Sequence, residues 1–128
     1  MSNPIATLGT VTINTAEPRR LAQFWMKILD VEISQEIPGD YFIWLRPQRR
    51  GGVAIAFQKV EEPQATPGRV HVDTTVEDIQ VARRQIEELG GSLVAEHDMM
   101  GYRWSIMADP DGNRFCIVER PQKQAQPD

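Results

Sequence analysis

The stretch VTINTAEPRRLAQFWMKILDVEI at Val11–Ile33 recurs in altered form as VHVDTTVEDIQVARRQIEELGGSLV at Val70–Val94. Each copy begins with a short run rich in β-branched residues, which is typical of a strand. A segment with the apolar spacing of a helix follows, and then a second strand-like run. The repeat therefore predicts that the chain contains two copies of one supersecondary unit.

The first copy carries a helical pattern. Its apolar residues fall at i, i+3, i+4, i+7 and i+8, namely Leu21, Phe24, Trp25, Ile28 and Leu29. This spacing predicts one apolar face on an amphipathic helix. Pro18 would lie in the first turn, where its missing N–H does no harm.

The second copy carries a similar pattern, with apolar residues at Ile79, Ala82, Ile86 and Leu89. Thr75 precedes this segment, and we expect it to cap the helix N-terminus. Glu77 and Asp78 would then lie near the positive end of the helix dipole. The pair Gly90–Gly91 should end the helix, because glycine readily takes positive φ.

The remaining segments are predicted strands separated by turn residues. They are Leu8–Asn14, Val31–Glu36, Tyr41–Arg46, Val53–Gln58, Arg69–Thr74, Ser92–His97, Tyr102–Ala108 and Asn113–Glu119. The order is β-α-β-β-β twice, which predicts an α+β fold of two tandem βαβββ modules at about 8–60 and about 69–119. A module of about 60 residues hardly buries its own sheet face. We therefore expect one domain over 1–128, in which curved mixed sheets enclose a cleft, with a loose polar tail at 120–128.

The composition is that of an ordinary soluble domain. The chain has 128 residues, of which 41% are hydrophobic and 25% charged, and its net charge is −4. A negative net charge argues against nucleic acid as a partner. We interpret the basic run Arg46–Arg50 as a solvated loop. No apolar run approaches the roughly 20 residues of a membrane helix, and no signal peptide is visible. A single cysteine, Cys116, fits a cytoplasmic location.

Three stretches together resemble a known family. They are AEPRRLAQFW at Ala16–Trp25, FQKVEEP at Phe57–Pro63 followed by RVHVD at Arg69–Asp73, and WSIMADPDGNRFC at Trp104–Cys116. In this order and spacing they resemble the vicinal oxygen chelate superfamily, which contains glyoxalase I, bleomycin-resistance proteins and extradiol dioxygenases. The closest resemblance, over about residues 8–120, is to glyoxalase-like domain proteins. It implies the fold but not a reaction, because function lies in a site that the fold presents.

The resemblance also implies where a metal would bind. Metal-dependent members place four ligands, usually His, Glu or Gln, on the first and last strands of each half. His71 stands at one of these positions, and Asp73 shares its strand face because side chains alternate. In the first half the matching histidine position falls at Thr10, Val11 or Thr12, none of which is a usual ligand for zinc, nickel, manganese or iron. Asp73 is predicted to orient His71 or a ligand, or to lie near the surface.

The last strand of each half supplies the other two positions. On the last strand of the first half, Val53–Gln58, Gln58 is the one side chain able to ligate a metal. In the second half the acidic ligand of relatives is replaced by Cys116, and Glu119 would point to the opposite face unless the register slips. A metal held by His71, Gln58 and Cys116 therefore stays one alternative, and a site without metal the other.

Cys116 allows two further interpretations. Across the sheet from His71 it would be a nucleophile, whereas within the apolar run FCIV it would be a core residue. The nearby acids Asp109 and Asp111 do not form an EF-hand loop, because the sixth and twelfth positions are Arg114 and Arg120. They are interpreted as part of a tight turn.

Aromatic side chains on the predicted strands complete the candidate ligand site. The expected lining residues are Trp44, Tyr102 and Trp104; Phe42, Phe57, His97, Met99 and Met100 are further candidates. About half of the aromatic residues should face the helices instead, and the sequence does not say which. A cleft with such a lining would suit a flat, partly apolar molecule with one or two polar groups.

Two functions follow as hypotheses. The first is binding of a small organic ligand without the full metal site, as in bleomycin-resistance proteins. The second is an enzyme: a metal-dependent isomerase, lyase or dioxygenase, or a metal-free catalyst that uses His71 as acid and base. The resemblance further implies a homodimer.

Overall fold

The computed structural model of the chain describes residues 4–99 and 101–120. The first module comprises β1 (Thr7–Thr15), α1 (Pro18–Leu29), β2 (Ile33–Ile37), β3 (Phe42–Leu45) and β4 (Ala54–Lys59). The second comprises β5 (Val70–Val76), α2 (Ile79–Glu88), β6 (Ser92–Met99), β7 (Tyr102–Ala108) and β8 (Arg114–Glu119). The α+β fold and the β-α-β-β-β order of both modules are confirmed. Within the described ranges, no helix is long and apolar enough to cross a membrane.

The strands form a single mixed sheet. Its order is β2-β3-β4-β1-β5-β8-β7-β6, so each module contributes one half. Within the modules β1 pairs with β4, and β5 with β8, in parallel. The modules meet where β1 and β5 pair antiparallel, with Thr12 opposite His71. The first strands of the two modules therefore join the predicted sheets into one continuous sheet, and they bring the beginnings of the two repeat copies together.

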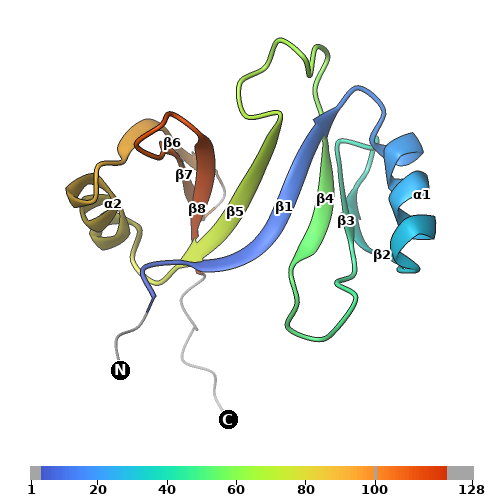
Figure 1. Cartoon of the computed structure of the whole chain (residues 1–128), viewed down its shortest axis with the longest axis horizontal. Coiled ribbons are helices and arrows are strands. Elements are labelled where there is room, and N and C mark those ends of the chain that lie inside the picture. Colours follow the sequence, from blue (N-terminus) through green and yellow to red (C-terminus); the bar gives the residue numbers. More distant parts are fainter. Residues whose placement is uncertain (1–3, 100, 121–128) are drawn as a thin grey trace.

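Both helices pack on the same face of this sheet, which is called the helix face below. The helix α1 covers β3 and β4 through a core cluster of Ala22, Ile43, Leu45 and Phe57. The helix α2 covers β7 and β8 through a second cluster of Val76, Ile79, Ala82, Met107 and Ile117. Figure 1 shows the two helices at opposite ends of the molecule, with β1 and β5 between them. Each module thus has its own core, and the sheet joins the two cores.

The opposite face, called the inner face below, carries no helix among the described residues. Its central side chains are nevertheless buried, since Thr12 and Ala56 are both 0% exposed. On this face Thr12 donates a hydrogen bond to Asp73 of the neighbouring β5. The inner face is therefore the surface on which residues from the two modules converge.

The orientation of α1 differs from the predicted stripe. Phe24 and Ile28 are 56% and 60% exposed, whereas Ala22 is buried and Leu21 and Trp25 pack on the core. Apolar residues occupy two neighbouring faces of α1, and the residues of either face have the spacing of an amphipathic helix. Packing against the sheet selects the face that carries the small Ala22, which allows close approach.

The N-terminus of α2 also differs from the prediction. Thr75 belongs to β5, and Asp78 is the N-cap, with its carboxylate accepting from the N–H groups of Gln80 and Val81. The N–H of Ile79 is bound by Glu119 of β8 at 3.0 Å. The predicted cap was therefore wrong by three residues, because β5 continues through Thr75 to Val76.

Strand bounds agree with the predictions to within about two residues, in the usual range of uncertainty at element ends. Changes of two residues occur at the start of β2, the end of β5 and the end of β6, which extends to Met99. Met100 and residues 121–128, which include most of the predicted tail, lie outside the described residues.

Candidate functional site

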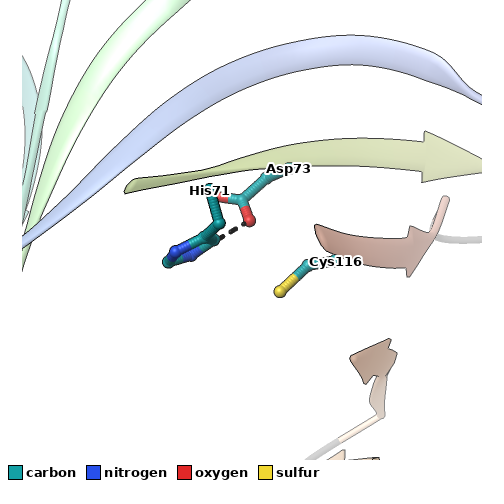
Figure 2. A group of neighbouring side chains, drawn as sticks. All are labelled: His71, Asp73 and Cys116. Carbon is teal, nitrogen blue, oxygen red and sulfur yellow. Dashed lines mark ion pairs between the residues drawn. The ribbon is translucent and has the colours of Figure 1, made fainter. Parts of the chain in front are cut away.

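A cluster of three ionisable side chains lies on the inner face of the second module. His71 and Asp73 alternate along β5, and Cys116 of the adjacent β8 pairs with Asp73. One nitrogen, oxygen or sulfur atom of each side chain lies within 4.8 Å of the other two. Figure 2 shows the three side chains directed toward the same space. The parallel pairing of β5 with β8 thus brings together residues that are 43 to 45 positions apart in the chain.

His71 is held in a defined orientation. Its Nδ1 lies 2.8 Å from the carbonyl oxygen of Gly68, and its Nε2 lies 3.5 Å from Oδ1 of Asp73. Because a carbonyl oxygen only accepts, Nδ1 is the nitrogen that carries hydrogen. In the neutral ring Nε2 is therefore left with its lone pair, so it can accept a proton or bind a cation. The side chain is only 13% exposed, which limits competition from water.

Asp73 connects the two modules through its carboxylate. Thr12 of β1, which is fully buried, donates from Oγ1 to Asp73 Oδ2 at 2.5 Å. The same carboxylate lies beside Cys116 and His71. Asp73 is 23% exposed, so it faces the inner surface rather than bulk solvent. Asp73 therefore belongs to the inner face, and its orienting role toward His71 or a ligand stays a prediction.

Cys116 is a protonated thiol in this environment. Burial, together with the negative charge and hydrogen bond of Asp73, raises the pKa of Cys116 to about 12. A nucleophilic cysteine needs the opposite shift, because the thiolate is the reactive form. Although His71 lies close by, the surroundings of the sulfur do not activate it. The interpretation of Cys116 as a nucleophile thus lacks the electrostatic support that it requires.

The first module presents neutral side chains at the equivalent places. Asn14 pairs with Gln58 across β1 and β4 as Asp73 pairs with Cys116 across β5 and β8. Thr12, two residues before Asn14, corresponds in the same way to His71. Of the three positions considered for the missing histidine, the register selects Thr12. The site thus combines an ionisable half with a neutral half.

Asn14 is the inner-face residue that the sequence analysis missed. It is 5% exposed, and its Nδ2 donates to the Gly68 carbonyl at 3.2 Å. The signal was present in the repeat, because Asn14 aligns with Asp73 when Val11 is placed over Val70. An amide is a weak metal ligand, so a pattern of metal-binding residues does not include Asn14.

Two aromatic stacks flank the polar centre on the same face. In the first module Phe42 and Trp44 of β3 stack with ring centroids 4.1 Å apart. In the second module His97 of β6 stacks on Trp104 of β7 at 5.0 Å. Strand alternation places both pairs on the inner face, because the intervening residues of β3 and β7 contact the helices.

The other aromatic candidates divide between the two faces. Tyr102 alternates with Trp104 and is 61% exposed near the start of β7. Phe57 is fully buried in the core beneath α1, so it does not line the inner face. Gln58, the next residue, points the other way and reaches the inner face.

Two carboxylates near β8 have structural roles: Glu119 at its end and Asp109 in the turn that precedes it. Glu119 lies on the helix face, where its Oε2 binds the N–H of Ile79 at the start of α2. Asp109 accepts hydrogen bonds from the backbone N–H groups of Asp111 and Asn113. The side-chain amide of Asn113, together with these backbone groups, lowers the pKa of Asp109, and the bonds stabilise the turn before β8. Neither carboxylate belongs to the cluster on the inner face.

The nitrogen, oxygen and sulfur atoms of the cluster determine which metal ion it could hold. An imidazole, a carboxylate and a thiol at this spacing fit zinc, which accepts nitrogen, oxygen and sulfur ligands with one position left open. Bound zinc would favour the thiolate of Cys116 and so oppose the pKa shift found without it. The neutral residues of the first module offer only hydroxyl and amide groups, which are weak ligands.

Comparison with known proteins supports the fold. A family model described as a glyoxalase-like domain matches residues 10–118. No curated protein matches the chain. Among solved structures, methylmalonyl-CoA epimerase from Mycobacterium tuberculosis is similar, with a TM-score of 0.71 and 15% identity over 96% of this chain and 94% of that one.

Two further structures have the same fold. A glyoxalase/bleomycin resistance protein/dioxygenase superfamily member from Vibrio splendidus has a TM-score of 0.62 and 17% identity, covering 90% of this chain and 99% of that one. A methylmalonyl-CoA epimerase from Streptomyces coelicolor, in complex with 2-nitronate-propionyl-CoA, has a TM-score of 0.65 and 16% identity, covering 91% and 98%. At these identities the likeness concerns the fold alone.

Proposed function

The chain belongs to the glyoxalase-like domain family, with the vicinal oxygen chelate fold, and we propose that it binds a small, flat organic ligand on its inner face. In this proposal no tightly held metal ion is needed. The observation that carries it is the arrangement of two aromatic stacks, Phe42 with Trp44 and His97 with Trp104, on either side of a polar centre. Apolar walls with a few convergent polar groups are typical of ligand sites.

The polar centre supports orientation of a ligand rather than covalent chemistry. Asp73 is engaged by Thr12 and lies beside Cys116, whose raised pKa keeps the sulfur protonated. His71 offers Nε2, and Gln58 offers an amide on β4. These groups supply both donors and acceptors to a ligand with one or two polar substituents. Related folds accept organic ligands, as the Streptomyces coelicolor epimerase complex illustrates.

The proposal is tested with a library of small organic compounds screened by thermal shift. Compounds that raise the melting temperature of the wild-type chain are then measured with Trp44→Leu and Trp104→Leu. Each substitution removes one aromatic wall, so we expect at least a tenfold loss of affinity, equivalent to about 1.4 kcal/mol. Phe24→Leu is the matched control, because Phe24 is an exposed aromatic residue on α1, away from the inner face. Equal binding by all four proteins would refute the placement of the site.

A second candidate function is a metal-dependent or acid–base enzyme. The specific observation in its favour is the grouping of His71, Asp73 and Cys116, whose donors fit zinc. A bound divalent ion would act as a Lewis acid toward an oxygen of the substrate. In the metal-free form His71 Nε2 would accept a proton from the substrate, and the Gly68 carbonyl would hold the imidazole through Nδ1.

The two candidates differ in their dependence on His71. In the enzyme His71→Ala should abolish metal uptake or proton transfer, because it removes the one imidazole of the cluster. In the binding protein the same change should weaken ligand affinity moderately and leave metal content unchanged. Isothermal titration with zinc and with the ligand from the screen, on wild type and variant, separates these outcomes.

We also propose that the protein is a cytoplasmic homodimer. Apolar side chains are exposed on the helix face between the two modules, where Leu8, Val70 and Val72 are 49%, 60% and 37% exposed. A second copy of the chain would remove this surface from water. Sedimentation equilibrium tests the assembly: Val70→Lys should shift the protein to monomers, and a wild-type monomer would refute it.

A further inference from the structure

We propose that Asn14 is a specificity-determining residue, whose side-chain carbonyl oxygen accepts a hydrogen bond from a hydroxyl or N–H group of the bound ligand. The inference rests on the proposed function, because it names a chemical group that the inner-face ligand must carry. It goes beyond that function, since it predicts which of two ligands of the same shape the site prefers.

The first observation is an unpaired acceptor. Asn14 is 5% exposed, and its Oδ1 has no hydrogen-bond partner within residues 4–99 and 101–120. Its Nδ2 donates to the carbonyl oxygen of Gly68 at 3.2 Å. The amide cannot be reversed, because Oδ1 would then face another acceptor. Buried polar atoms in native proteins are nearly always paired, so this oxygen requires a partner that the described part of the chain does not provide.

The second observation is that Asn14 is fixed relative to His71. The Gly68 carbonyl accepts from Nδ2 of Asn14 and lies 2.8 Å from Nδ1 of His71. Gly68 has a φ of +76°, a conformation that favours glycine, and its carbonyl oxygen lies within hydrogen-bond distance of both side chains. The acceptor of Asn14 is thus part of the same rigid arrangement that orients the imidazole, rather than an isolated amide.

The third observation concerns the electrostatic character of the neighbouring groups. In the second module the equivalent position is Asp73, whose carboxylate is already engaged by Thr12 and Cys116. In the first module the amide of Asn14 is neutral, and its oxygen is screened from water and has no partner among the described residues. A ligand donor placed there would be neutral or cationic. Sites built to pair with a donor discriminate strongly against an analogue that lacks it, because the buried acceptor is then left unpaired.

The experiment compares 2-naphthol with 2-methylnaphthalene, which share a flat apolar body and differ in a hydroxyl against a methyl group. Each probe is titrated into the uniformly labelled wild-type chain and into Asn14→Leu, followed by proton–nitrogen correlation NMR. The control is Gln23→Leu, which replaces an exposed amide on α1. The side-chain amide resonance of Asn14 is assigned in the wild type by through-bond triple-resonance NMR, independently of the variant.

In the wild type we expect 2-naphthol to bind about tenfold more tightly than 2-methylnaphthalene, as one hydrogen bond implies. The Asn14 amide resonance should shift with the first probe and not with the second. Asn14→Leu should abolish the preference by weakening only naphthol binding, and Gln23→Leu should retain it. A purely structural role for Asn14 would change the affinities for both probes equally.

Two results would overturn the inference while ligand binding on the inner face stands. One is equal affinity of the wild type for both probes, as expected if a water molecule satisfies Oδ1. The other is an unchanged preference in Asn14→Leu. If neither probe shifts inner-face resonances of the wild type, the proposed function fails for flat aromatic ligands, and the inference fails with it. The wild-type amide resonance decides the matter even if the variant does not fold.

Discussion

Among single residues, Cys116 shows most directly how surroundings determine chemistry. The sulfur lies on β8 next to Asp73, and burial together with this carboxylate raises the pKa of the thiol to about 12. The same residue type beside a cation would be a reactive thiolate. The sequence predicted that Cys116 reaches the inner face. It did not predict the sign of the pKa shift, because that sign depends on which charged residue the fold places beside the sulfur.

The reactivity of Cys116 toward iodoacetamide follows from this environment. At pH 8 the native protein should be alkylated much more slowly than the unfolded chain, because almost none of the buried sulfur is thiolate. Asp73→Asn should accelerate alkylation, since it removes the negative charge that raises the pKa of Cys116. Mass spectrometry of quenched samples measures both rates. If the native wild type were alkylated as fast as the unfolded chain, the thiol of Cys116 would not be protonated as described.

The dependence of stability on pH has a defined sign. The folded-state pKa of Cys116 lies above the ordinary value of 9.0, so the protonated thiol contributes stability that is fully present below pH 9. That contribution should be lost as the pH rises from 9 toward about 12. The free energy of unfolding of the wild type should therefore fall more steeply above pH 9 than that of Cys116→Ser, as measured by urea denaturation. Parallel curves for the two proteins would contradict this.

At the scale of elements, the start of α2 is held by residues from two places in the chain. Asp78 caps it locally, and Glu119 of β8 binds the N–H of Ile79. Helical periodicity predicted the existence of α2 but placed its cap at Thr75. Sequence spacing alone does not reveal how far the preceding strand continues, and a cap from a distant strand has no local signal.

Glu119→Ala should therefore destabilise the fold and leave the inner face unaffected. Loss of a helix-capping hydrogen bond typically costs about 1 kcal/mol, and the negative charge near the helix N-terminus is lost as well. Urea denaturation measures the free energy of unfolding, and titration with a ligand or zinc tests the inner face. Unchanged stability combined with weaker binding would place Glu119 in the site instead.

The helix α1 shows a related limit. Its existence and its start near Pro18 follow from the sequence, but the buried face does not, because Phe24 and Ile28 are exposed. Several apolar residues around the helix make two faces acceptable, and contact with β3 and β4 selects one. Exposed fractions of this kind are determined by tertiary packing rather than by helical propensity.

At the scale of the whole molecule, the internal repeat predicted two β-α-β-β-β modules, and the structure has them. The repeat did not predict that β1 and β5 pair to form one sheet. This pairing places Thr12 opposite His71 and brings Asn14 and His71 to the same Gly68 carbonyl. Local sequence patterns do not predict how distant strands pair. They therefore do not predict which side chains of the site face one another.

The same pairing gives the site its asymmetry. One module provides His71, Asp73 and Cys116, and the other provides neutral groups at the equivalent positions. A metal ion would have strong ligands from one side only, whereas a flat organic ligand meets aromatic walls from both modules. For this reason the account favours ligand binding over metal-dependent chemistry.

The most direct test of this central claim is the metal content of the chain, purified without chelators and without an affinity tag that binds metals. Inductively coupled plasma mass spectrometry gives the molar ratio of zinc, nickel, manganese and iron to protein. The account predicts a ratio far below one metal ion per chain, with the inner face still able to bind ligands. A ratio close to one, lost in His71→Ala, would contradict it and establish the metal-dependent alternative.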